Sequence, residues 1–224
     1  MVRQFIQHRL KTKIRGGGEP SIQKRGQYIK RFTGEVQIKS IELFGDSFSD
    51  GSSGWIGESL NAFTTTLPYS FTTHAIGGNN LADIKVIFDA NSPFTSDTAV
   101  ILQGSINNVA GDVGKQTDLQ TMKDDMSAMA DQVIAAGNKL AIVGLSPFKG
   151  HVNYDVAARQ QAIDYNAWLL ANYGSYYVEI YTLLGDSIDA DQLADEFYKL
   201  ARTDLHPNKN ADKMIDEGDR KSVV

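Results

Sequence analysis

The chain of 224 residues contains no cysteine. It can therefore form no disulfide and no thiolate metal site, and a cysteine nucleophile is excluded. No apolar run reaches the roughly 18 residues that a membrane span requires. The N-terminus also lacks the apolar core of about 7–15 residues that marks a secretory signal peptide. These absences leave the localisation open, with a secreted protein among the possibilities.

Positive charge is concentrated at the N-terminus. Residues 1–39 hold ten Lys or Arg and two Glu, a charge of +8, which leaves −13 for the remainder out of −5 overall. We interpret residues 1–36 as a basic arm that is solvated, or that mediates homo-oligomer formation or adsorption to a surface. Nucleic acid is not expected as a partner, because aromatic side chains are not interleaved with the charge as in single-strand binders.

From residue 37 onward, the pattern alternates between strands and helices. Short apolar runs bounded by Gly, Pro, Asn or Ser predict strands at Ile38–Phe44, Tyr69–Ala75, Ala99–Gln103, Leu140–Leu145 and Tyr176–Tyr181. Three- and four-residue spacings predict helices at Ile56–Phe63, Leu81–Phe88, Leu119–Ala136 and Val156–Leu170. The last helix is expected to bury Ala157, Ile163, Ala167 and Leu170. This alternation indicates a parallel sheet with helices on both faces and a site at the carboxyl ends of its strands.

A glycine, an acid and a serine follow the apolar run Ile41–Phe44, in the segment Gly45–Asp50. The hydroxyl of Ser47 is therefore expected at a strand tip, where it becomes a nucleophile once a base removes its proton. A capping serine in a strand-to-helix turn is the structural alternative. The segment also matches part of a calcium loop, but Phe48 and Gly57 stand at ligand positions, so no calcium site is predicted.

A histidine lies beside an acid near the other end of the chain, at Asp204 and His206. His206 precedes a proline and a helical stretch, whereas His8 falls in the basic arm and His151 in an expected solvated loop. A loop histidine at a helix entry could reach a strand-tip serine, although an exposed or structural histidine is the alternative. A serine near the start of the chain, with an acid and a histidine near its end, provides the residues that covalent acyl transfer requires.

Two further segments follow predicted strands and could donate hydrogen bonds to an oxyanion. The first contains Gly77 and Gly78, which would let a backbone N–H approach a substrate closely. A phosphate cradle is the weaker alternative there, because the spacing of phosphate-binding motifs is absent. The second contains Asn107, whose side-chain amide can donate to an oxyanion. A pair of Asn residues that form a turn and a cap is the alternative for this segment.

These motifs occur in the order found in the SGNH (GDSL) hydrolase family, which the chain resembles over roughly residues 38–217. The resemblance implies a flavodoxin-like three-layer α/β/α sandwich with a mostly parallel five-stranded sheet, in a domain at 37–218. It also implies a serine esterase that uses no metal or other cofactor. Carried over by position, the nucleophile is Ser47 and the general base is His206. The implied oxyanion hole consists of Ser47 N–H, Gly78 N–H and the Asn107 side chain.

The chain departs from the family pattern in two motifs. The third motif usually reads Gly-x-Asn-Asp, but Ser105 and Asn108 stand in place of its Gly and its Asp. In the last motif the acid usually stands three residues before the histidine, where this chain has Thr203, and Asp204 stands two residues before it. We expect Asp204 to orient His206, with a main-chain carbonyl as the alternative.

The predicted function is hydrolysis of carboxylic esters through an acyl-serine intermediate. Short acyl chains are expected because no long apolar lid segment is present, and the substrate would be a small-molecule, glycan or lipid ester. An acyl-thioesterase would use the same residues. The altered motifs also allow a catalytically weak relative that binds carbohydrate or a surface, and a nucleotide-binding flavodoxin-like protein ranks last.

Residues 219–224 read like the translation of a sequencing adapter that runs into a stop codon. We interpret them as a non-native tail of a gene assembled from environmental DNA. A source locus that continues in frame without these codons would support this interpretation.

Overall fold

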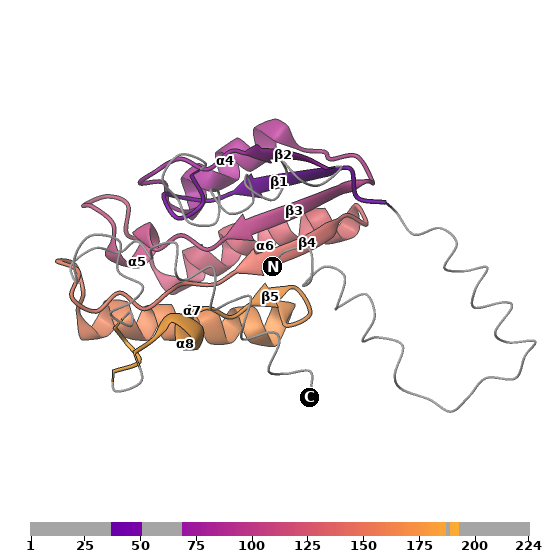
Figure 1. Cartoon of the computed structure of the whole chain (residues 1–224). Helices are drawn as coiled ribbons and strands as arrows, with labels where there is room; N and C mark the ends of the chain where they lie inside the picture. Colours follow the sequence, from indigo (N-terminus) through magenta and orange to yellow (C-terminus); the bar gives the residue numbers. More distant parts are fainter. Residues whose placement is uncertain (1–36, 51–68, 187–188, 193–224) are drawn as a thin grey trace, which may run out of the picture.

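The computed structural model describes residues 37–50, 69–186 and 189–192 of the chain (Figure 1). The basic arm, the predicted helix at Ile56–Phe63, the residues Asp204 and His206 and the tail at 219–224 lie outside this part. The strands are β1 (Ser40–Phe44), β2 (Ser70–Thr73), β3 (Thr98–Gln103), β4 (Lys139–Val143) and β5 (Tyr177–Val178). The helices are α4 (Leu81–Asn91), α5 (Asn107–Ala110), α6 (Leu119–Ala135), α7 (Val156–Tyr173) and α8 (Tyr181–Leu184).

The five strands form one sheet in the order β2-β1-β3-β4-β5, and every neighbouring pair is parallel. This is the strand order of flavodoxin-like sheets, in which ligands bind outside the carboxyl ends of the strands. The predicted five-stranded parallel α/β fold is confirmed. The strand predicted at Tyr176–Tyr181 is shorter than expected, since β5 ends at Val178, and α8 begins at Tyr181.

Helices α4, α6 and α7 pack side by side, with α6 between the other two (Figure 1). Helix α4 also packs on β1, where the ring centroids of Phe44 and Phe88 are 5.3 Å apart, and the Phe44 centroid lies 5.8 Å from that of Phe94, which follows α4. All six residues of β3 are buried, so both faces of the sheet are covered at its central strand. Among the described residues, no helix combines the length and the apolar character needed to cross a bilayer.

Each of the three longer helices begins at a polar side chain that caps it. Asn80, Asp118 and Asp155 each accept a hydrogen bond from the backbone N–H three residues later. Such caps satisfy N–H groups that have no partner within the helix. They explain why α6 and α7 begin at Leu119 and Val156, as the sequence predicts.

The buried face of α7 differs from the predicted one. The predicted stripe ended at Leu170, but this side chain is 59% exposed, and Ala157 and Ala167 are also exposed. The residues of α7 that pack against the core are Ala162, Tyr165, Asn166, Leu169 and Tyr173. The prediction was wrong because this face buries two tyrosines and an asparagine, which a count of aliphatic residues does not weigh.

Two adjacent leucines test this face of α7. Leu169 is fully buried, so Leu169→Ala should lower the free energy of unfolding by about 2–5 kcal/mol through lost burial and a residual cavity. Leu170→Ala removes the same atoms from an exposed position and should cost less than about 1 kcal/mol. Urea denaturation of both variants measures the difference. A larger loss in Leu170→Ala would contradict the observed register.

Candidate active site

Ser47 lies in a tight turn directly after β1. The turn is closed by a hydrogen bond from Ser49 N–H to the carbonyl of Asp46, with an N···O distance of 3.0 Å. Asp46 and Phe48 are buried on either side, whereas Ser47 itself is partly exposed. Only a glycine fits before the turn, because a Cβ on Gly45 would lie 2.6 Å from the Gln103 side-chain oxygen. The turn thus places the partly exposed Ser47 at the carboxyl end of the sheet.

The predicted glycine pair lies beside this turn. Ile76 N–H donates to the carbonyl of Gly45 at 3.2 Å, which continues the pairing of the two chain segments beyond the ends of β1 and β2. A Cβ on Gly77 would lie 3.7 Å from the Cβ of Ser47. Gly78 follows with a φ of 81°, a conformation that favours glycine. The second motif therefore reaches Ser47 by way of Gly77, and Gly78 supplies the turn into the next segment.

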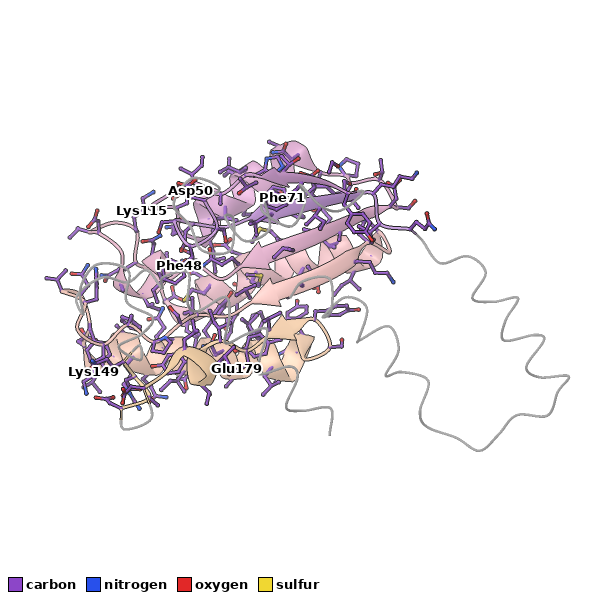
Figure 2. The ribbon with its side chains drawn as sticks, viewed as in Figure 1. Phe48, Asp50, Phe71, Lys115, Lys149 and Glu179 are labelled. Atoms are coloured by element: carbon purple, nitrogen blue, oxygen red, sulfur yellow. The ribbon has the colours of Figure 1, made fainter. Side chains whose placement is uncertain are left out.

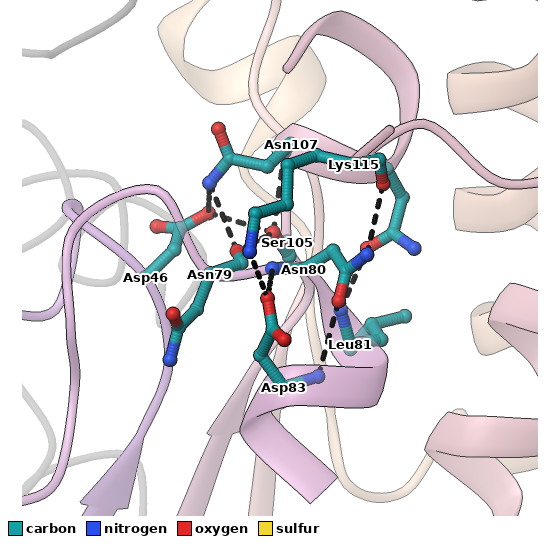
Figure 3. A network of polar contacts seen from close by, with 9 residues as sticks. Asp46, Asn79, Asn80, Leu81, Asp83, Ser105, Asn107 and Lys115 are labelled. Carbon is teal, nitrogen blue, oxygen red and sulfur yellow. Dashed lines mark hydrogen bonds and ion pairs between the residues drawn. The ribbon is translucent and has the colours of Figure 1, made fainter. Parts of the chain in front are cut away.

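The carboxylate of Asp46 joins the first motif to the third (Figure 3). Its Oδ1 accepts from Phe48 N–H at 2.9 Å. Its Oδ2 accepts from the Ser105 hydroxyl at 3.1 Å, from Ile106 N–H at 3.2 Å and from the Asn107 amide at 3.4 Å. Complete burial raises the pKa of Asp46, and the hydrogen bonds that it accepts act in the opposite direction.

Gln103 forms a second link between the ends of β1 and β3. Its side-chain oxygen accepts from Asp46 N–H at 2.9 Å and from the Ser49 hydroxyl at 3.1 Å. Its side-chain nitrogen donates to the carbonyl of Gly104. Sequence reasoning missed the roles of Gln103 and Asp46. The available signal was a polar residue at the end of an apolar strand, which must find partners when it is buried.

Asn107 lies at the start of α5 and faces the first two motifs. Besides its contact with Asp46, its side-chain amide donates to the carbonyl of Asn79 at 2.9 Å. The Ser105 hydroxyl lies 2.6 Å from the same carbonyl, so its one proton is shared between this oxygen and Asp46, and its oxygen accepts from Asn107 N–H at 3.2 Å. The structure therefore brings together the serine turn, the glycine loop and the asparagine that the sequence singled out.

Asn108, which stands in place of the family's Asp, has a structural role. Its side-chain oxygen accepts from Leu81 N–H, the first amide of α4, at 2.9 Å. Its side-chain nitrogen donates to the Thr117 hydroxyl at 2.6 Å. An asparagine supplies both the acceptor and the donor that these two contacts require. The side chain thus ties the start of α4 to the loop after α5.

The loop after α5 is also held by an ion pair at the capped end of α4. Lys115 Nζ lies 2.5 Å from the Asp83 carboxylate, and the hydrogen bond between them is the main cause that lowers the pKa of Asp83. Asp83 also completes the capping box with Asn80. Figure 2 places Lys115 toward the same end of the molecule as Phe48 and Asp50, which lie in and beside the turn of Ser47.

Two of the four histidines lie in the described residues. His74 Nε2 is 2.7 Å from the Glu42 carboxylate, and its ring stacks on Phe44 at a centroid distance of 4.6 Å. His151 is half-buried instead of fully solvated, and its Nδ1 accepts from Asn153 N–H at 3.3 Å. Within residues 37–50, 69–186 and 189–192, no three His, Asp or Glu side chains converge as metal ligands.

A sequence model of the GDSL-like Lipase/Acylhydrolase family matches residues 43–213 of this chain. That match covers most of the chain and includes the serine turn, the glycine loop and the Asn107 segment. The chain belongs to the GDSL-like lipase and acylhydrolase family, as the sequence motifs indicated. None of the curated proteins matches the chain significantly in sequence.

Solved structures with the same fold include three hydrolases. A GDSL-like lipase from Bacteroides thetaiotaomicron is 15% identical, with a TM-score of 0.63 over 88% of this chain and 95% of its own. An acetyl xylan esterase is 16% identical, with a TM-score of 0.59 over 83% and 100% of the two chains. The esterase EstA from Pseudoalteromonas is 15% identical, with a TM-score of 0.52 over 83% and 96%. At these identities the likeness shows the fold.

Asp46→Asn tests the carboxylate that joins the motifs. The amide has nearly the same shape and removes a buried charge, but it turns one of two acceptor oxygens into a donor that faces other donors. We expect the free energy of unfolding to fall by about 1–3 kcal/mol in urea denaturation at neutral pH. Asp89→Asn is the control, because its pair with Lys85 is on the helix surface, and it should change by less than about 0.5 kcal/mol. Equal stability of the Asp46 variant and wild type would contradict the assignment.

Proposed function

We propose that the protein is a serine esterase that hydrolyses carboxylic esters through an acyl-serine intermediate. Membership of a family of lipases and acylhydrolases supports this reaction class. The observation that carries the proposal is the partly exposed Ser47 in a tight turn at the carboxyl end of β1. Buried residues surround it, and the Asp46 carboxylate links its turn to Asn107. A turn that needed only a cap would not require this linkage.

The proposed reaction has two halves. Ser47 Oγ attacks the ester carbonyl while His206 takes the hydroxyl proton, and the tetrahedral oxyanion is held by Ser47 N–H, Gly78 N–H and the Asn107 amide. When the tetrahedral intermediate collapses, the bond between the acyl carbon and the alcohol oxygen breaks, and the alcohol leaves with the proton from His206. Water then attacks the acyl-serine with the same histidine as base, which releases the acid and restores Ser47. Asp204 orients the His206 ring.

The proposed substrates are esters of short acyl chains on a small molecule, a glycan or a lipid. The acetyl xylan esterase among the structural relatives supports an acetylated glycan as one such substrate. The altered third motif does not favour an inactive relative, because Ser105 and Asn108 both make hydrogen bonds that hold the site together. An esterase with its own local polar network accounts for these departures better than a degenerate site does.

Ser47→Ala should reduce hydrolysis of p-nitrophenyl acetate and butyrate by at least about 10³-fold, because the attacking oxygen is lost. Ser175→Ala is the matched control, since this exposed serine precedes β5 at the opposite end of the sheet, and it should keep wild-type rates. The rates on a decanoate ester and on an acyl-thioester show which acyl-chain length and which leaving group the enzyme prefers. Equal rates for wild type and Ser47→Ala would exclude the esterase and favour a binding protein.

The last motif is tested by His206→Ala and Asp204→Asn. Loss of the general base should lower kcat by about 10³-fold or more, and loss of an orienting acid should lower it by up to about 10⁴-fold with little change in KM. Steady-state kinetics on the butyrate ester measure both effects. If Asp204→Asn keeps the wild-type kcat, a main-chain carbonyl orients the histidine instead.

A further inference from the structure

Ser105 stands where the family pattern has glycine, and its hydroxyl lies at the centre of the site's polar network. The side chain is fully buried at the end of β3. Its oxygen lies 2.6 Å from the Asn79 carbonyl, 3.1 Å from the Asp46 carboxylate and 3.2 Å from Asn107 N–H. A glycine at this position would have none of these contacts, so the hydroxyl adds hydrogen bonds that the usual glycine lacks.

Two oxygens share the side-chain donors in this network. The Asn79 carbonyl and the Asp46 Oδ2 are each within hydrogen-bond distance of both the Ser105 hydroxyl and the Asn107 amide (Figure 3). The hydroxyl supplies one proton and the amide supplies two, so three protons face two oxygens. Whenever each oxygen receives one proton, one proton remains for another acceptor, whichever way the hydroxyl points.

Removing the hydroxyl changes this balance. The Asn79 carbonyl would then keep only the Asn107 amide as a side-chain donor, and the second amide proton would face the Asp46 carboxylate, which also accepts from Ile106 N–H. An incoming oxyanion would then have to compete with the negatively charged Asp46 carboxylate for the second amide proton, because taking the first would leave the Asn79 carbonyl without a side-chain donor. The Asn107–Asp46 contact is the longest in the network at 3.4 Å, so it is the one that the amide gives up most readily.

We propose that Ser105 is a positioning residue, whose hydroxyl satisfies the Asn79 carbonyl or the Asp46 carboxylate and so leaves one Asn107 amide proton for the oxyanion. Ser105 does not touch the substrate in this assignment. It acts through Asn107 by keeping that side chain in place and one of its donors available. This inference rests on the proposed function and adds a residue that the family's glycine-containing motif does not supply.

The test is a double-mutant cycle on the butyrate ester with Ser105→Ala, Asn107→Ala and the double variant. Removal of one oxyanion donor typically lowers kcat by about 10²–10³-fold, which sets the upper limit for Ser105→Ala. We expect Ser105→Ala to lower kcat by at least about 10-fold with KM changed less than about 2-fold. In the Asn107→Ala background the same change should lower kcat by less than about 2-fold, because its only route of action is gone.

Ser146→Ala is the matched control. Ser146 is also fully buried and follows the neighbouring strand β4, and within the described part of the chain its hydroxyl has no hydrogen-bond partner. Its loss should leave both kcat and KM within about 2-fold of wild type. An equal fall in kcat in the two serine variants would show that loss of any buried hydroxyl after these strands impairs the enzyme. This result would overturn the proposal.

The remaining outcomes separate this inference from the proposed function. If wild type hydrolyses the ester and Ser105→Ala matches it, or lowers kcat equally in both backgrounds, the positioning role is wrong and the esterase stands. If Ser105→Ala and Ser105→Gly both lose the cooperative thermal transition, Ser105 serves stability and the positioning role is again wrong. If wild type neither hydrolyses esters nor reacts at Ser47 with an organophosphonate, as read by mass spectrometry, the proposed function itself fails.

Discussion

The site depends on one buried carboxylate. Asp46 is fully buried, and burying a charge is costly unless hydrogen bonds compensate for it. The donors that compensate come from both sides of the site, with Phe48 N–H from the turn of Ser47 and the Ser105 hydroxyl and Ile106 N–H from the end of β3. Because this buried charge takes donors from both strand tips, it opposes a shift of β1 relative to β3. The position of Ser47 relative to Asn107 follows from that constraint.

The two departures within the third motif become understandable as parts of the same polar network. Asn108 needs an amide, since it accepts from the first N–H of α4 and donates to Thr117. Ser105 adds a hydroxyl where a glycine would leave the Asn79 carbonyl to the Asn107 amide alone. A motif comparison counts both residues as losses, whereas their contacts show that each one satisfies buried groups. For this reason the departures weigh less against activity than their number suggests.

The fold was more predictable than the packing of its individual helices. Strand positions followed from short apolar runs, because a parallel sheet buries both faces of its central strand. The face of α6 followed from its methionines, and Met122, Met126 and Met129 are all buried as their spacing indicates. Helix α7 was predicted in the right place with the wrong face, since Leu169 and not Leu170 enters the core. Its buried face includes Asn166, whose side chain bonds the backbone N–H and carbonyl of Leu145, partners that a helical repeat does not specify.

The sequence by itself determined the order of the elements, the family and the residue types of the site, because each rests on local runs, turns and short motifs. Only the tertiary structure decided which of these residues meet. Gln103, Asp46 and Ser105 form a network across strands that lie more than fifty positions apart in the chain, and no local pattern encodes their distances. The physical reason is that a buried polar group must find its donors in three dimensions, and the parallel order of β1 and β3 brings them to the same edge of the sheet.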